Sequence, residues 1–132
     1  MKKNFKYLVL GKSFLFLLIV FWGGYNATMV GVETGDGYLS NIGNALFMVF
    51  SIFYLLNAFF LFKLKILGRS TFLPLICMFV LLGFVGEIIN PMEIQRDYFY
   101  LITFYVISPL FFIAQGMVFS MLIEKDFREN FN

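Results

Sequence analysis

The sequence predicts an all-α integral membrane protein built as a bundle of four transmembrane helices. Of its 132 residues, 61% are hydrophobic and only 14% are charged, which is far from the mixture that keeps a globular domain soluble. The apolar residues form four blocks, each close to the ~20 residues that a helix needs to cross ~30 Å of hydrocarbon. Basic residues gather in alternate loops between these blocks, which is typical of multi-pass membrane proteins.

The four predicted spans are residues 8–30, 42–62, 72–90 and 99–123. They use nearly the whole chain, so residues 1–132 are predicted to form a single transmembrane domain. The longest hydrophilic stretch, residues 31–41, is too short to bury a core of its own. The first span follows a basic start but lacks a convincing small-residue cleavage site, so we interpret it as a retained span rather than as a signal peptide.

The distribution of lysine and arginine predicts that both termini are cytoplasmic. Eight basic residues lie before span one, between spans two and three, or after span four: Lys2, Lys3, Lys6, Lys63, Lys65, Arg69, Lys125 and Arg128. The opposite side carries Arg96 alone, and positive residues resist translocation. The formal net charge of +2 gives no reason to expect nucleic-acid binding.

Prolines mark two of the predicted spans. Pro74, preceded by Thr71, is expected to start span three, and Pro91 to end it, because proline fits the first turn of a helix and blocks its continuation. Pro109 lies near the middle of span four, so we expect a kink there. The single cysteine, Cys77, lies within span three, where we expect it to pack, with no intramolecular disulfide.

Small and polar residues recur at helical spacing along each predicted span. The four stripes are Lys12, Gly23 and Asn26; Asn44, Ser51 and Ala58; Gly83, Gly86, Glu87 and Asn90; and Tyr105, Ser108, Phe112 and Gln115. One interpretation is that they meet inside the bundle, with Gly83, Gly86, Ser51 and Ala58 as helix contacts. The other is that they line a polar cavity, with Glu87, Asn90, Asn26, Asn57 and Gln115 as its candidate site.

Depth in the membrane separates the two charged residues of the predicted spans. Lys12 is expected about one turn from the cytoplasmic end of span one, and Glu87 about one turn from the outer end of span three, roughly 20 Å apart along the membrane normal. An ion pair between them within one subunit is therefore excluded. We expect Lys12 to extend its amino group to the inner headgroups, and Glu87 to contact Asn26, Asn90, Arg96 or interfacial water.

The residue types give little support for catalysis. The chain has no histidine and one cysteine, which removes the commonest general base and the usual ligands of zinc, haem and iron–sulfur clusters. We therefore expect no metal, no cofactor and no enzyme, although an enzyme acting on lipid or quinone at the interface stays open as a minor alternative. Glu33 and Asp36 could hold a cation weakly, but a solvated turn suits this glycine-rich loop better.

The arrangement resembles the small four-span bacterial membrane proteins of the DoxX-like group and similar uncharacterised families. The resemblance rests on the short basic start, on a glycine-bearing third span that ends Leu81-Leu-Gly-Phe-Val-Gly-Glu-Ile-Ile-Asn-Pro91, and on the central proline of span four. It implies the four-helix fold and a location in the bacterial inner membrane, and it assigns no site residue.

Two functions follow as predictions. In the first, the bundle acts by helix contacts, without catalysis, as a subunit, an accessory factor or a protective, immunity-like factor. In the second, it forms an oligomeric channel or transporter for a small solute or ion that uses Glu87, because four spans alone enclose little space. Both predict that the protein works in the lipid bilayer as a homo-oligomer or with a membrane-protein partner.

Overall fold

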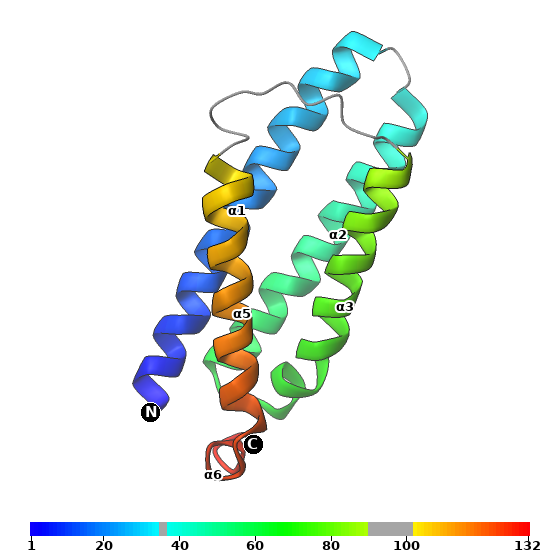
Figure 1. Ribbon diagram of the computed structural model, residues 1–132. Helices are drawn as coiled ribbons and strands as arrows, with labels where there is room; N and C mark the ends of the chain where they lie inside the picture. Colours follow the sequence, from blue (N-terminus) through cyan, green and yellow to red (C-terminus); the bar gives the residue numbers. More distant parts are fainter. Residues whose placement is uncertain (35–36, 90–101) are drawn as a thin grey trace.

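The fold is a set of long helices that run side by side (Figure 1). The computed structural model describes the backbone of residues 1–34, 37–89 and 102–132, and the side chains of residues 1–22, 45–83, 102–103 and 105–132. The elements are α1 (Lys2–Thr34), α2 (Gly37–Phe62), α3 (Ile66–Ile89), the π-helical turn η1 (Thr103–Ile107) with α5 (Ser108–Ile123), and α6 (Lys125–Arg128). Within those described ranges there is no β-strand.

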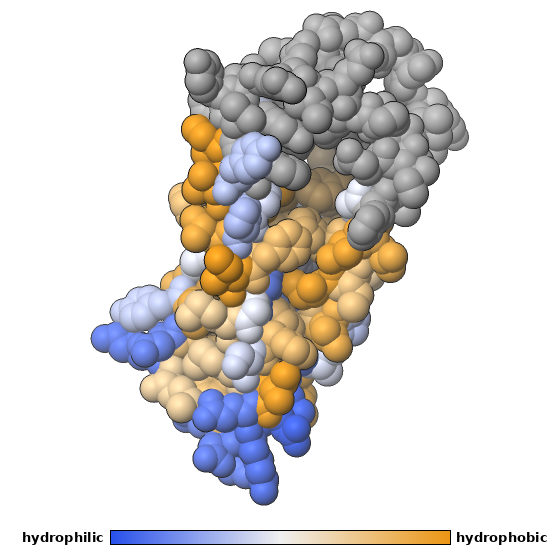
Figure 2. All heavy atoms as spheres, viewed as in Figure 1, coloured by the Kyte–Doolittle hydropathy of each residue, from blue (hydrophilic) through white to orange (hydrophobic). Residues whose placement is uncertain are grey.

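Four segments are long and apolar enough to cross a membrane: Lys2–Trp22, Ala45–Phe62, Ile66–Gly83 and Tyr105–Ile123. The expectation of an all-α chain with four potential spans is thus confirmed. Both termini and the α2–α3 turn lie at one end of the bundle, called here the terminal end (Figure 1). Hydrophilic residues gather at this end, whereas apolar side chains cover the middle of the visible face (Figure 2).

Three of the helices share one spacing of buried residues. The intervals are four, three and four residues in each case: Phe5, Val9, Lys12 and Phe16 on α1; Phe50, Tyr54, Asn57 and Leu61 on α2; Phe111, Gln115, Val118 and Leu122 on α5. This heptad-like spacing keeps one seam of each helix turned toward its neighbours, as in left-handed helical bundles. On the described part of α3, only Gly68 and Phe72 are buried.

The buried apolar residues form two clusters at different depths. The cluster nearer the terminal end includes Phe5, Val9, Leu61, Phe72 and Val118, and the C-terminal Phe127 and Phe131 close it. The second consists of Phe16, Phe50, Tyr54 and Phe111. Lys12 and Gln115 lie between the two clusters along their helices, and the hydroxyl of Tyr54 reaches them from the second cluster, so polar groups meet between two apolar layers.

The helices form an open array rather than a closed ring. α3 packs on α2, α2 on α1, and α1 on α5. The backbones of α3 and α5 stay apart, and large aromatic side chains bridge the gap. The Phe72 and Phe119 rings stack with centroids 6.4 Å apart, and the Phe79 and Phe112 centroids are separated by 6.2 Å.

A tight hairpin joins α2 to α3. Leu64 in the turn has a positive φ of 56°, a conformation that is costly for a residue with a side chain. Beyond the turn, the Asn57 amide donates to the Gly68 carbonyl at 2.6 Å and to the Thr71 hydroxyl at 2.9 Å. Gly68 is essential to this approach, because a Cβ there would lie 2.6 Å from the backbone nitrogen of Leu61.

The C-terminal segment folds back against the terminal end of the bundle. The Phe127 ring contacts Phe5 with centroids 4.8 Å apart, and Phe131 meets the same ring edge-on at 5.9 Å. The Asn132 backbone N–H donates to the Leu64 carbonyl, and its carbonyl accepts from Ile66 N–H. These contacts tie α1, the α2–α3 turn and the last residues of the chain together.

Several sequence-based expectations about individual residues require correction. Helix α1 begins at Lys2 and α3 at Ile66, six residues before each predicted span, because charged residues near a membrane end need not interrupt a helix. Pro74 therefore lies inside α3, where Thr71 and Ser70 hydroxyls donate to the Leu67 carbonyl within the same turn. Cys77 is exposed rather than packed.

Pro109 changes the helix in a specific way. The π-helical turn Thr103–Ile107 precedes it directly, and Ser108 N–H donates to the Thr103 carbonyl, five residues back. Proline has no N–H, and its ring crowds the carbonyl four residues earlier, so the wider turn relieves that conflict. The predicted irregularity is thus a π-helical turn on the N-terminal side of Pro109.

The contact at Gly68 predicts a strong difference between two glycines of α3. Gly68→Ala should lower the free energy of unfolding by about 1–3 kcal/mol, because backbone atoms of α2 occupy the space that a methyl group needs. Gly83→Ala is the matched control, since a Cβ at Gly83 meets no atom within 4 Å. Thermal unfolding in detergent measures both, and equal effects would contradict the close contact at Gly68.

Candidate functional site

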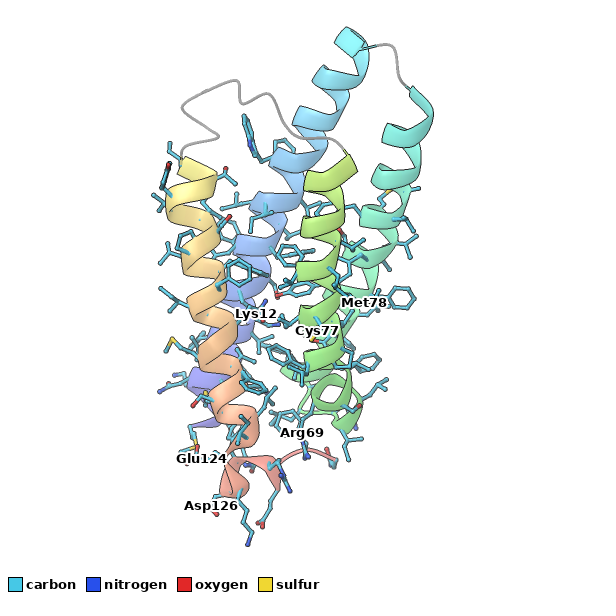
Figure 3. All side chains as sticks on the ribbon, turned by 45° about the vertical axis from the view of Figure 1, so that its right-hand side comes forward. Lys12, Arg69, Cys77, Met78, Glu124 and Asp126 are labelled. Atoms are coloured by element: carbon cyan, nitrogen blue, oxygen red, sulfur yellow. The ribbon has the colours of Figure 1, made fainter. Side chains whose placement is uncertain are left out.

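Lys12 is the centre of the candidate site. It lies on α1, its side chain is 0% exposed, and Figure 3 shows it well inside the bundle, far from Arg69, Glu124 and Asp126 at the terminal end. Its Nζ donates to the Tyr54 hydroxyl at 3.3 Å and to the Gln115 side-chain oxygen at 3.4 Å. Within the described part of the chain, Lys12 has no carboxylate partner, and the oxygens that accept its hydrogen bonds are both neutral.

Lys12 lies several turns from the terminal end of the bundle, with its amino group turned inward. It lies ten residues beyond the first residue of α1, about 15 Å along the helix axis. Tyr54 and Gln115 each lie eight residues from the end of their helices at the terminal end, about 12 Å away. All three residues thus share one level of the bundle. The expectation that Lys12 extends its amino group to the inner headgroups is wrong, because that group is buried against Tyr54 and Gln115 of two neighbouring helices.

Tyr54 and Gln115 also bond to each other. The Gln115 amide nitrogen donates to the Tyr54 hydroxyl, so each pair among Lys12, Tyr54 and Gln115 is joined by a hydrogen bond. The three residues come from α1, α2 and α5. This closed polar triad therefore fixes the rotation of three helices about their axes.

Aromatic rings enclose the rest of the Lys12 amino group. Its Nζ lies 4.7 Å from the centroid of the Tyr54 ring and 4.8 Å from that of Phe72, within the range of cation–π contacts. One turn farther along, the Phe16 ring stacks on Tyr54 with centroids 4.0 Å apart. The rings around Phe16 close the triad off from the half of the bundle beyond them.

A groove opens between α3 and α5 at the level of the triad. It has a volume of about 200 Å³ and is lined by Phe72, Leu73 and Ile76 of α3 and by Phe112, Gln115, Gly116 and Phe119 of α5. Gln115 is its one side chain with hydrogen-bonding groups. Gln115 and Phe72 also contact Lys12, so these two side chains lie between the groove and the buried amino group.

The structure brings together some of the predicted site residues. Gln115, Asn57, Ser51 and Ala58 are all buried. Gln115 belongs to the triad, whereas Asn57 joins α2 to α3. Ser51 donates to the Phe47 carbonyl of its own helix at 2.7 Å. Ala58 belongs to the apolar cluster nearer the terminal end, in agreement with its predicted helix contact.

Other predicted residues lie elsewhere. Gly83 is exposed, and no part of the described chain comes close enough to contact a Cβ there. Asn90 lies outside the described residues, and for Glu87, Asn26 and Gly86 the structure describes the course of the backbone alone. The candidate site centred on Glu87 therefore stays a prediction.

Sequence reasoning missed the central roles of Lys12 and Tyr54. A signal for them does exist in the sequence: residues 5, 9, 12 and 16 repeat the spacing of 111, 115, 118 and 122, and each set holds one strongly polar residue. Neither set stands out by hydropathy, because the other faces of these helices are also apolar. Counted from the terminal end, Lys12 and Gln115 are each the third residue of their set, so placing the two sets side by side in opposite chain directions pairs Lys12 with Gln115.

The amino group of Lys12 has more donor capacity than its two hydrogen bonds use. Nζ offers three hydrogens, and the described residues accept two of them. Both hydrogen bonds are longer than the ~2.7–2.9 Å typical of a lysine bound to a carboxylate. Among the residues whose side chains are described, no group of three or more metal-ligating residues occurs. The site can therefore give hydrogen bonds to a further acceptor.

Comparisons with protein-family models, with curated proteins and with solved structures find no match to this chain. The resemblance to the DoxX-like group accordingly stays a prediction.

The burial of Lys12 predicts its reactivity. An amine-acetylating reagent applied in mild detergent should modify the exposed Lys63 and leave Lys12 unmodified, because the reagent cannot reach a side chain with no accessible surface. Both should react after denaturation in SDS, as read by peptide mass spectrometry. Reaction of native Lys12 at the rate of Lys63 would show instead that its amino group reaches the interface.

The triad predicts a coupling between Lys12 and Tyr54. Tyr54→Phe should lower the free energy of unfolding by roughly 1 kcal/mol, because it leaves the Lys12 amino group with one oxygen fewer. In a Lys12→Met background the same change should lose at least half of its effect. Ser51→Ala is the control, since Ser51 bonds only within its own helix. A Tyr54→Phe effect of equal size in both backgrounds would show that the triad contributes no coupling energy.

Proposed function

We propose that the protein is a non-catalytic, multi-pass membrane protein that acts by binding another membrane component through its helices, as a subunit, an accessory factor or a protective factor. The proposal places it in the bacterial inner membrane with both termini in the cytoplasm. The basic residues of both terminal segments and of the α2–α3 turn, which share one end of the bundle (Figure 1), support that orientation.

The observation that carries the proposal is the buried Lys12. Placing a lysine near the middle of a membrane costs about 2.5–3.5 kcal/mol on insertion scales, and such residues usually serve a function. A methionine would fill the same space without that cost. The neutral oxygens of Tyr54 and Gln115 offset only part of it, since both hydrogen bonds are long. An acceptor from a second molecule would offset the remainder, which favours a binding role.

The surface of the helices also suits contact within the bilayer. Large apolar side chains such as Phe14, Phe21 and Met48 are more than 60% exposed. They would face either lipid or the helices of another chain. Without water between the helices, such contact depends on close packing and on polar groups, and Lys12 with Gln115 supplies the latter.

The alternative function, a channel or transporter that uses Glu87, receives less support. In the described part of the bundle, the rings of Phe16, Phe50 and Phe111 fill the space beside the triad. A polar path along the axis of one subunit would have to cross these rings. A channel of this protein would therefore run between subunits.

Gentle extraction of the tagged protein from its own membranes, followed by native mass spectrometry, tests the proposal. A second membrane component should remain bound at a fixed stoichiometry, because packed helices release it slowly in mild detergent. A monomer or homo-oligomer that retains nothing else would contradict the proposal. The alternative would then predict a flux in liposomes that Glu87→Gln abolishes without a change in thermal stability.

A further inference from the structure

We propose that the α3/α5 groove is the docking site for a transmembrane helix of a different protein, and that this helix carries an aspartate or glutamate whose carboxylate binds Lys12 and Gln115. The inference rests on the proposed function and names the binding face and the chemistry of the partner.

The groove lies on the side of Lys12 that faces α3, and one layer of side chains separates it from the buried amino group. Within the described bundle, α2 and α5 both pack on α1 and contact Lys12. Along α1, the apolar cluster nearer the terminal end precedes Lys12 and the second cluster follows it. Toward α3, the amino group faces the Phe72 ring and the amide of Gln115. Both of these side chains line the groove.

The size of the groove fits one side chain. Its volume is about 200 Å³, and a protein cavity of ~150 Å³ is large enough to hold a benzene molecule. A carboxylate on a short stem therefore fits between the Phe72–Phe119 and Phe79–Phe112 pairs. There it would accept a hydrogen bond from the Gln115 amide, and a turn of the Phe72 side chain would let it also accept one from Nζ of Lys12.

The rim of the groove favours a helix as the carrier of this carboxylate. Gly116 lines the groove, and a Cβ added to it meets no atom within 4 Å. Ser120 follows one turn later on the same exposed side of α5. Two small residues four apart allow a neighbouring backbone to approach closely within a membrane. A partner helix that lies along this face brings its side chains directly over the groove.

The carboxylate belongs to a different chain rather than to a second copy of this one. Glu87 is the one acidic residue within a predicted span. It lies 21 residues along α3 from Ile66, about 32 Å, whereas Lys12 lies about 15 Å along α1. In a parallel copy with the same orientation, Glu87 would therefore be far from the level of Lys12.

The test uses a synthetic 21-residue transmembrane peptide of leucine and alanine with one glutamate at its midpoint. The midpoint lies about 15 Å from either end, so the direction of insertion does not change the depth of the carboxylate. An otherwise identical peptide with glutamine is the control. Energy transfer in liposomes, between a dye at Lys2→Cys in a Cys77→Ser background and an acceptor on the peptide, measures binding.

We expect the glutamate peptide to bind at least tenfold more tightly than the glutamine peptide, and Lys12→Met to abolish this preference. Gly116→Leu should weaken binding of both peptides, because the new side chain fills the groove. Gly83→Leu, at an exposed glycine of α3 away from the groove, should leave binding unchanged. Thermal unfolding of each variant shows that the bundle itself is intact.

Equal binding of the two peptides, or a preference that survives Lys12→Met, would overturn the docking site. Tight binding of palmitate that depends on Lys12, with no preference between the peptides, would also overturn it and assign the groove to a lipid carboxylate. The proposed function is judged separately. If extraction retains a partner that Lys12→Met and Gly116→Leu do not release, the protein binds that partner through another face.

Discussion

The structure depends on keeping the buried amino group of Lys12 hydrogen-bonded. Lys12 has no exposed surface, so oxygen atoms from the protein must serve as its acceptors. Tyr54 of α2 and Gln115 of α5 supply them, and their own hydrogen bond holds both in place. This requirement sets the rotation of three helices together, because a turn of any one of them would remove an oxygen from Lys12.

The number and approximate positions of the helices could be predicted from the sequence because length and hydropathy determine which segments suit the bilayer. The rotation of each helix could not. On α1, Phe14 is 63% exposed and Phe16 is 0% exposed, yet the two residues are chemically identical. A soluble helix would reveal its buried face by polar residues on the other side, whereas lipid accepts phenylalanine as readily as a core does.

The part of the candidate site that could be predicted consists of polar residues. Gln115 and Asn57 were recognised as interior because an amide is costly in hydrocarbon, and both are buried. The same argument does not predict the burial of Lys12, because a long lysine side chain near the end of a span can also extend to the headgroups. The rotation of α1, which turns Lys12 toward Tyr54 and Gln115, decides between the two positions.

The four helices do not contribute equally, and this asymmetry leaves the groove open. α1, α2 and α5 each present a complete seam of buried residues, whereas the described part of α3 buries only Gly68 and Phe72. Asn57 and the tight turn hold α3 against α2, which keeps its first turns away from the backbone of α5. Three helices therefore enclose Lys12 on three sides. On the fourth side the Phe72 ring and the Gln115 amide separate Lys12 from the groove, and in the proposed complex a turn of the Phe72 side chain brings an acceptor to the amino group while the helices keep their positions.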